Sequence, residues 1–364
     1  MATIKRKKFL TGGSGVLGEA LLNILPHKDI IALHHHNPVN GATIEAIKGS
    51  ISTPQLGLNN SDYKHLVSNI NAVIHCASMT QFVGRQRHII ETNVQGTREM
   101  LTLAERAETP LFYISTAFTH HSCQKPAGEN PYIDSKLEAE EILKSSSHPI
   151  TIIRPSIITG NSNTGYIPKL QGFHSLMHLV LEGALPVLPV DQTSYVDFMP
   201  SDIIARLIAG IIDKNLVGHE FWLSLGEQRA PNLKKLAQHL KEISEAETGK
   251  PLELPKYVST DMYQRLIKPA IIPALPHTFV KEYRRLEKLE GYFSLNTPLP
   301  SSLDILRGHG VTAEYSLLNA FKNDIVHLIK GQQKLSSLTI PTPKVHTGIN
   351  YGTNGTRLEV TNNA

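Results

Sequence analysis

The run Thr11-Gly12-Gly13-Ser14-Gly15-Val16-Leu17-Gly18 decides the fold. The strand-like residues Phe9 and Leu10 precede it, and an apolar helical pattern that ends at Pro26 follows it. Glycine lets the chain turn sharply and approach a pyrophosphate closely, while the helix N-terminus supplies N–H donors. The run therefore predicts a dinucleotide-binding turn between the first strand and the first helix of an α/β domain.

Short apolar runs alternate with helical patterns along the first 225 residues. Helices are expected over about 85–107 and 131–143, and further strands over residues 30–33, 72–76, 111–115, 150–154 and 220–223. This alternation predicts a Rossmann-type doubly wound parallel sheet with helices on both faces. A smaller, mostly helical C-terminal part is expected to bind the substrate.

We expect three units along the chain. Residues 1–230 form the NAD(P)-binding core, with a substrate-loop excursion at about 161–194, and residues 231–335 form a C-terminal cap. Residues 336–364 are rich in Ser, Thr, Pro and Asn, a composition typical of a flexible tail.

The composition is that of a globular protein, with 40% hydrophobic and 19% charged residues and a net charge of +4. This small charge gives no reason to expect a nucleic-acid partner. Two cysteines, Cys76 and Cys123, fit a reducing compartment. No apolar run reaches the ~18 residues of a membrane span, and no signal peptide is expected. We therefore expect a cytoplasmic protein without a transmembrane segment, either a monomer or a homodimer.

The end of the second strand bears on the choice of cofactor. A carboxylate there holds the ribose hydroxyls of NAD, whereas cationic groups accept the 2′-phosphate of NADP. The run Leu33-His34-His35-His36-Asn37 has no carboxylate, which favours NADPH, with partly protonated His34 and His36 near the phosphate. The plainer alternative is that these histidines are exposed loop residues. Consecutive histidines cannot face one way, so no metal site is expected.

Tyr132 and Lys136 form a Y-x-x-x-K element in a predicted helix. Positions i and i+4 share one helical face, so the phenol and the ammonium group can point at the same space. A nearby ammonium stabilises phenolate and lowers the pKa of tyrosine from about 10. A surface tyrosine and lysine match this spacing by chance, so the pair needs support from its position.

That support comes from the strand that ends in Tyr113-Ile114-Ser115-Thr116-Ala117-Phe118. Ligands of doubly wound sheets lie beyond the carboxyl ends of the strands, where Ser115 and Thr116 fall. A hydroxyl there can bind the reacting carbonyl oxygen. Asn93, on the preceding helix, either braces the lysine through water or is an ordinary helix residue.

These motifs, in this order, resemble those of the extended short-chain dehydrogenase/reductases. Within that class the chain is similar to the thioester reductase and fatty acyl-CoA reductase branch, which includes the reductase domains of carboxylic acid reductases and nonribosomal peptide synthetases. The resemblance covers roughly residues 8–225, and the segments that point to the branch are residues 49–58, 113–118, 153–165 and 195–202.

The resemblance implies that Thr116, Tyr132 and Lys136 are catalytic, and Asn93 is kept as a further candidate. Ser50 and His34 depart from the family, which usually has an aspartate and an arginine there. The implied cofactor-binding residues are Thr11, Gly12, Ser14, Gly15, Val16, Leu17, Gly18, His34, His36, Ser50, Ile51, Cys76, Ala77, Ser78, Ser115, Pro155, Ser156 and Ile158.

The resemblance also implies a reaction, the transfer of hydride from NADPH to an acyl thioester carbonyl. The thioester would be carried by CoA or by a carrier protein in trans, and the product would be an aldehyde or alcohol of lipid or secondary metabolism. Two alternatives stay open: an enzyme of the same fold acting on a nucleotide sugar or a free ketone or aldehyde, and a non-catalytic NADP-sensing protein. Residues 166–190 and 255–300 either line the acyl site or are only the core of the cap.

Overall fold

A seven-stranded sheet forms the centre of the protein, with every neighbouring pair of strands parallel. The strand order is β10-β6-β5-β4-β1-β2-β3. The strands are β1 (Lys7–Thr11), β2 (Ile30–His34), β3 (Glu45–Lys48), β4 (Ile70–His75), β5 (Leu111–Ile114), β6 (Ile150–Pro155) and β10 (Glu220–Leu223). The computed structural model describes residues 6–39, 43–80, 86–120, 130–271, 273, 280 and 292–336.

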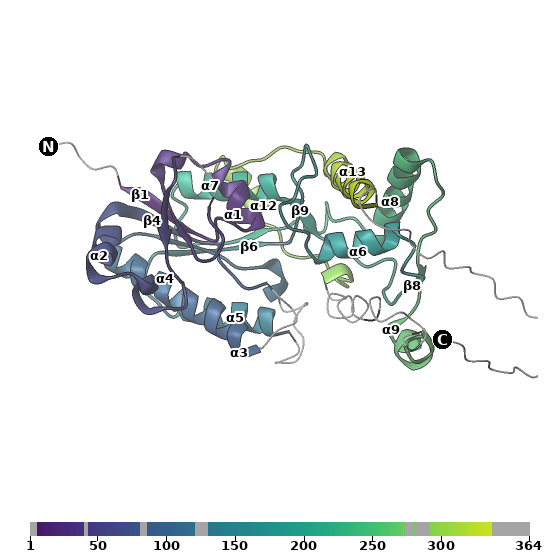
Figure 1. The fold of residues 1–364 in the computed structure, drawn as a ribbon, viewed down its shortest axis with the longest axis horizontal. Helices are drawn as coiled ribbons and strands as arrows, with labels where there is room; N and C mark the ends of the chain where they lie inside the picture. Colours follow the sequence, from purple (N-terminus) through teal and green to yellow (C-terminus); the bar gives the residue numbers. More distant parts are fainter. Residues whose placement is uncertain are drawn as a thin grey trace, which may run out of the picture.

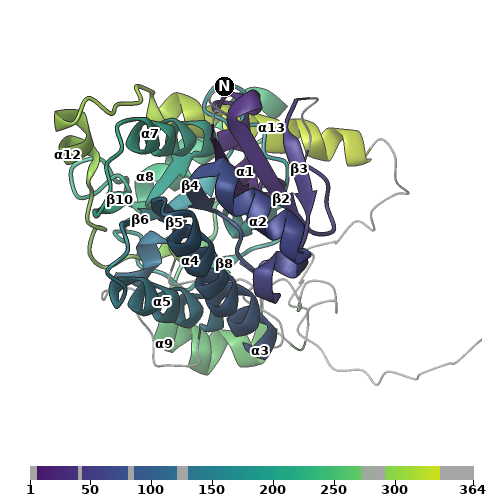
Figure 2. The ribbon, with the colours of Figure 1, turned by 90° about the vertical axis from the view of Figure 1, so that its left-hand side faces the viewer.

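Helices cover both faces of this sheet (Figure 2). One face packs against α1 (Val16–Leu22) and α7 (Ser201–Asp213), and the other against α2 (Asn60–Asn69), α4 (Gly96–Ala107) and α5 (Pro131–Lys144). Adjacent residues of β1 divide between the two cores: Leu10 belongs to the α1 and α7 side and Phe9 to the other. Successive strand residues face opposite sides of a sheet. A strand whose residues are apolar on both faces is therefore buried on both sides of the sheet. The predicted Rossmann-type doubly wound sheet is confirmed.

The helix expected over 85–107 is interrupted by a π-helical turn. It is built from α3 (Gln86–Ile90), a π turn over Glu91–Gln95, and α4. A π turn adds a residue to the helical repeat and is frequent at functional sites. Here it contains Asn93, which is buried.

A helical part follows the core along the chain (Figure 1). Its main helices α6 (Gly172–Leu181), α8 (Leu233–Thr248) and α13 (Leu317–Ser336) share one apolar cluster, in which Phe173 packs against Phe198 and Phe321. The smaller elements are β7 (Ile157–Thr159) paired with β9 (Phe198–Pro200), β8 (Val187–Leu188) paired with β11 (Lys256–Tyr257), α9 (Thr260–Met262), a π turn over Tyr263–Ile267, α10 (Lys268–Ile271), α12 (Leu303–Gly308), and 3-10 turns over His27–Asp29, Pro54–Gly57 and Ala117–Thr119.

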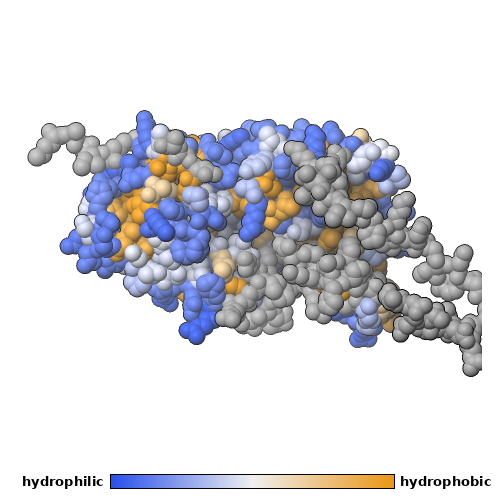
Figure 3. Space-filling view, in the orientation of Figure 1, coloured by the Kyte–Doolittle hydropathy of each residue, from blue (hydrophilic) through white to orange (hydrophobic). Residues whose placement is uncertain are grey.

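The chain returns to the sheet before its last helix. Leu306 of α12 and Val311 lie in the core with α1 and α7, and Val311 packs against Gly210 of α7. On the face drawn in Figure 3, apolar side chains gather between the sheet-bearing part and the helical part. Among the described helices, none has the length and apolar character that crossing a membrane requires. The expected tail beyond Ser336, and Cys123, lie outside the described residues.

Candidate active site

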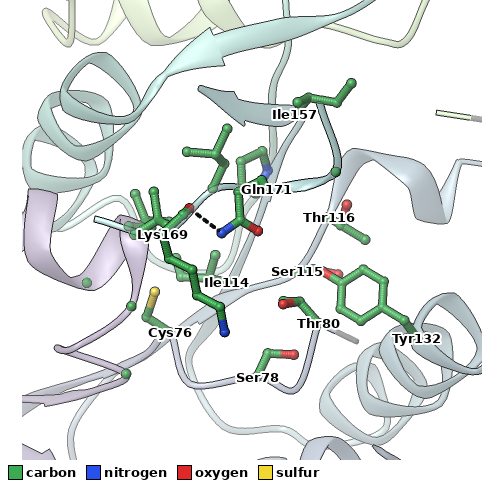
Figure 4. Close-up of a pocket in the computed structure, with 18 of the residues that line it drawn as sticks. Cys76, Ser78, Thr80, Ile114, Ser115, Thr116, Tyr132, Ile157, Lys169 and Gln171 are labelled. Atoms are coloured by element: carbon green, nitrogen blue, oxygen red, sulfur yellow. Dashed lines mark hydrogen bonds between the residues drawn. The ribbon is translucent and has the colours of Figure 1, made fainter. Parts of the chain in front are cut away.

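A cavity of about 460 Å³ lies at the carboxyl ends of β1, β4, β5 and β6. In doubly wound sheets, ligands bind where the strand order reverses, which here is between β1 and β4. The expected residues that line it are Gly12, Ser14, Gly15, Val16, Leu17, Gly18, Cys76, Ala77, Ser78, Ser115, Thr116, Tyr132, Lys136, Pro155, Ser156 and Ile158. Figure 4 shows Thr116 and Tyr132 on one side of this cavity and Cys76 on the other.

The glycine turn forms one wall of the cavity. Gly12 has a φ of +77°, and a Cβ there would lie 2.6 Å from the Ala77 nitrogen. A Cβ at Gly18 would collide with the Gly12 carbonyl oxygen. Only glycine allows the loop after β4 and helix α1 to approach the turn this closely. The backbone of the turn therefore faces the cavity directly.

Thr11 joins the ends of β1 and β4 and does not line the cavity. Its hydroxyl is 2.8 Å from His75 Nδ1 and accepts a hydrogen bond of 3.2 Å from the Ala77 N–H. Burial lowers the pKa of His75 to about 3, so this imidazole is neutral. Thr11 thus holds the loop that carries Cys76 and Ala77 beside the glycine turn.

Tyr132, Thr116 and Lys136 come together at the end of β5. Asn130 caps α5 by accepting from the Ile133 N–H at 3.3 Å, and Pro131 occupies the first turn. The Tyr132 and Thr116 side chains lie on the same side of the cavity (Figure 4). The Lys136 ammonium group donates 2.8 Å to the Ile114 carbonyl oxygen. The strand end and the first turn of α5 therefore present two hydroxyls and a cation to one cavity.

Burial changes the acidity of both α5 side chains. It raises the pKa of Tyr132 above its ordinary value, and the hydrogen bond with Thr116 opposes the rise. Burial lowers the pKa of Lys136 to about 8. A lowered tyrosine pKa was expected from the neighbouring lysine; the pKa is raised instead, because the phenol is buried and desolvation disfavours its charged form. The phenol is consequently a proton donor at neutral pH.

Ser115 and Thr116 are adjacent but have different partners. The Ser115 hydroxyl donates 2.5 Å to Glu140 on α5. Arg154 holds the same carboxylate with bonds of 2.9 and 2.6 Å, and it also reaches Glu220 at 2.6 Å. The Ser115 hydroxyl is therefore committed to a buried network that joins β5, β6 and α5. Thr116 is left as the hydroxyl of this strand end that meets Tyr132.

Asn93 is placed as a clamp between two segments of the site. Its oxygen accepts from the Ser78 hydroxyl at 3.1 Å and from the Met79 N–H at 2.7 Å. Its nitrogen donates to the Met79 carbonyl oxygen at 3.1 Å and to the Ser135 hydroxyl at 2.9 Å. An amide has two donors and two acceptor positions, so none remains for a water that leads to Lys136. The expected water-mediated brace is replaced by direct bonds to the residue before the lysine.

The residues expected around the adenosine lie outside the cavity lining. His34 Nδ1 is buried without a hydrogen-bond partner among the described residues, and the His36 ring lies against that of His35, with centroids 3.8 Å apart and the planes tilted by 51°. The Ser50 hydroxyl is 3.0 Å from that of Ser52. Ile51 packs against Gly96. Asn37 is the residue after β2 that lines the cavity, in place of His34 and His36.

Further residues line the cavity that the sequence did not single out one by one, although several fall within the segments 166–190 and 255–300 that were expected either to line the acyl site or to form the core of the cap. They come from loops on both sides of the cavity and from the helical part, and they are Asn37, Thr80, Ile114, Phe118, Ile157, Lys169, Gln171, Gly172, Phe173, Tyr292 and Phe293. The lining residues between 166 and 173 belong to the first of these expected segments, and Tyr292 and Phe293 belong to the second. Tyr292 and Phe293 lie more than 150 residues beyond Tyr132 in the chain, and only folding brings them together.

Comparisons with known proteins place the chain among reductases. Residues 28–208 match an NAD-binding family described as male sterility protein. The chain is 27% identical over 292 residues to the hybrid PKS-NRPS synthetase xenE of Xenoacremonium sinensis, which covers 70% of this chain and 7% of that protein. It is 27% identical over 197 residues to the fatty acyl-CoA reductase wat of Drosophila melanogaster, which covers 44% of this chain and 38% of that protein.

The fold is also that of a solved reductase domain. The terminal R domain from the myxalamid PKS-NRPS biosynthetic pathway superposes with a TM-score of 0.71 at 20% identity, covering 91% of this chain and 92% of that domain. At this identity the likeness speaks for the fold alone. The NAD-binding family match, the reductase relatives and this fold together indicate that the chain is an oxidoreductase with a nicotinamide cofactor. The protein belongs to the extended short-chain dehydrogenase/reductases, in the branch of the thioester reductases and fatty acyl-CoA reductases.

Proposed function

We propose that this protein is an NADPH-dependent reductase of acyl thioesters carried by CoA or by a carrier protein in trans. The observation that carries the proposal is the convergence of Thr116, Tyr132 and Lys136 on the cavity that the glycine turn also lines. The product would be an aldehyde, or an alcohol after a second reduction.

The cavity fits a nicotinamide dinucleotide. The turn from Gly12 to Gly18 supplies bare backbone beside the cavity, and Pro155, Ser156 and Ile158 line its far side. We propose that Cys76, Ala77 and Ser78 complete the cofactor contacts. When bound, the reduced nicotinamide supplies the hydride.

NADPH is the preferred cofactor in this proposal. No carboxylate lies among the residues at the end of β2, from His34 to Asn37, and an acid there would favour NAD. The buried, unpartnered His34 Nδ1 is a polar atom at the place where a 2′-phosphate would need donors.

The protein's own side chains would polarise the thioester. The Thr116 and Tyr132 hydroxyls would donate to the carbonyl oxygen as negative charge develops on it, and Tyr132 would then protonate that oxygen. Lys136 would hold positive charge close by. Collapse of the hemithioacetal breaks the C–S bond, returns the proton from the oxygen to the departing thiol, and leaves the aldehyde.

An aromatic lobe beyond Tyr132 supports an apolar acyl group. Phe118 and Tyr292 lie with ring centroids 4.4 Å apart, and Phe173 and Phe293 at 6.1 Å. All four line the cavity. A sugar would require a dense set of polar partners here, so the lobe favours the acyl substrate over a nucleotide sugar. We also infer that the helical part, with α6 and residues 231–335, is the substrate cap, except that α12 and Val311 return to pack on the core formed by residues 1–230.

The source of the acyl group follows from the relatives. The chain spans only 7% of the xenE synthetase, a protein far longer than this chain. We propose, from the synthetase and the fatty acyl-CoA reductase among these relatives, that the acyl group is presented as a thioester of a carrier protein or of CoA. Of the expected acyl-site segments, parts of 255–300 lie outside the described residues.

A substrate panel tests this function. The purified protein would be mixed with NADPH or NADH and with acyl-CoAs, acylated carrier protein, free aldehydes and UDP-sugars, while cofactor absorbance is followed. Oxidation of NADPH with an acyl thioester and release of free thiol is the expected result. Turnover of a free carbonyl or a UDP-sugar alone would move the enzyme to another branch of the fold. Cofactor binding without any turnover would favour the sensor alternative.

A further inference from the structure

Lys169 lines the same cavity, from a loop within the segment 166–190, and the sequence assigned this lysine no role of its own. Figure 4 shows its side chain directed into the cavity, with the ammonium group towards Cys76 and Ser78. The backbone between those two residues is the part that approaches Gly12 most closely, because a Cβ on Gly12 would touch the Ala77 nitrogen. Lys169 thus faces the part of the cavity that the glycine turn and the loop after β4 share.

The loop that carries Lys169 is held at both ends. At its start Gly165 packs tightly against Asn323 and Asp324 of α13. At its end the Gln171 side chain donates 3.0 Å to the Lys169 carbonyl oxygen. The Gln171 N–H donates 3.3 Å to His174 Nδ1, and His174 Nε2 lies 3.1 Å from Asp324. The backbone of Lys169 is therefore positioned by the fold.

The charges around the cavity are all of one sign. Its lining holds two lysines, Lys136 and Lys169, and no aspartate or glutamate. Lys136 already donates to the Ile114 carbonyl oxygen. Lys169 makes no ion pair with any described residue. A cation directed into a cavity free of carboxylates favours an anionic ligand.

We propose that Lys169 binds the diphosphate of the nicotinamide dinucleotide and acts as a cationic clamp across the cavity from the glycine turn. This inference rests on the proposed function, which puts a dinucleotide in this cavity. The 2′-phosphate is a poorer partner, because Asn37 alone represents the end of β2 in the lining. A phosphate of CoA could be bound by Lys169 in the same way. The test below distinguishes binding of CoA from binding of the dinucleotide.

Ligand binding to Lys169→Ala and Lys169→Arg is the test, with Lys234→Ala as the matched control. Lys234 is an exposed lysine of α8 outside the cavity lining, so its removal changes the net charge equally. The probes are NADPH, ADP-ribose, which keeps the diphosphate without nicotinamide or 2′-phosphate, and CoA. Dissociation constants come from fluorescence titration of NADPH and from calorimetry for the other two.

Lys169→Ala is expected to weaken NADPH and ADP-ribose by a similar factor, about fivefold to tenfold, because a charge-assisted bond is lost. CoA binding should be unchanged, and Lys169→Arg should restore most of the affinity. The loss should shrink at high salt, since salt screens exposed charges. Weaker binding of CoA alone, or no change for any probe, would overturn the inference while leaving the proposed function intact. Failure of the wild-type protein to bind any dinucleotide would overturn both.

Discussion

The Asn93 amide nitrogen donates a hydrogen bond of 2.9 Å to the Ser135 hydroxyl, one residue before Lys136. The Asn93 oxygen meanwhile holds the Met79 N–H at 2.7 Å. One buried side chain therefore ties the loop after β4 to the helix that carries Tyr132 and Lys136. The π turn places Asn93 where it can reach both segments.

Replacing this clamp should loosen the site. Asn93→Ala leaves the Met79 N–H and carbonyl without their partner, and we expect the free energy of unfolding to fall by about 2–3 kcal/mol. Chemical denaturation measures this, and Asn319→Ala, at an exposed asparagine of α13, is the control. Because Asn93 acts through Ser135 and Met79, kcat should fall while the pH profile keeps its shape. Unchanged stability would contradict the clamp.

The buried network behind the site makes a second prediction. Arg154 is 2% exposed and pairs with Glu140, itself buried. Arg154→Leu removes the buried cation from that carboxylate and leaves it with the longer ion pair of 3.7 Å to Lys144; breaking a buried ion pair typically costs about 3–5 kcal/mol. Thermal or chemical unfolding is the measurement. Arg87→Leu, which breaks the exposed pair with Glu91, should cost less than about 0.5 kcal/mol. The double variant Arg154→Leu with Glu140→Leu should recover part of the loss, and equal losses in the single and double variants would contradict this account.

The lowered pKa of Lys136 leads to a prediction for how the free energy of unfolding depends on pH. Its pKa is about 8 in the folded protein and near 10.5 when exposed. Between these values the unfolded chain binds more protons, so the free energy of unfolding should rise as the pH rises from about 8 towards 10.5. Subtracting the pH profile of Lys136→Met isolates this contribution. A difference that is flat over this window, or that falls, would contradict the burial of the ammonium group.

The sequence predicted the fold well because its signals are local. The strand that contains Phe9 and Leu10, like the later strands, is apolar on both faces. Continuous apolar runs of this kind are typical of parallel strands buried on both sides of a sheet. Edge strand β3 was missed, because the residues of Glu45–Lys48 are largely exposed and carry no apolar period. The glycine turn and the Y-x-x-x-K spacing are local signals too. They predicted that the glycines, Tyr132 and Lys136 lie beside one another.

The rest of the site depends on contacts between distant segments. The segments that contain Lys169 and Tyr292 were candidates for the acyl site, but no local pattern identified these two residues, since the packing of the helical part against the core brings them into the cavity that Gly12 lines. The hydrogen-bond partners of Asn93 and Ser115 are also far away in the chain. The sequence could therefore suggest roles for these side chains but could not predict their hydrogen bonds. Spacing predicts which residues share a helix face, whereas the partner across the fold is settled by tertiary packing.

The central claim is that the Tyr132 phenol, on the same side of the cavity as Thr116, protonates the reacting carbonyl oxygen. Single-turnover reduction of an acyl thioester by Tyr132→Phe with NADPH tests it most directly, with the NADPH dissociation constant measured on the same samples. Tyr257→Phe, at a half-buried tyrosine outside the cavity lining, is the matched control. The account predicts that the rate falls by about 10²–10⁴-fold, as expected for loss of a general acid, while NADPH affinity and the control remain at wild-type values. A Tyr132→Phe variant that reduces the thioester at the wild-type rate would contradict the account.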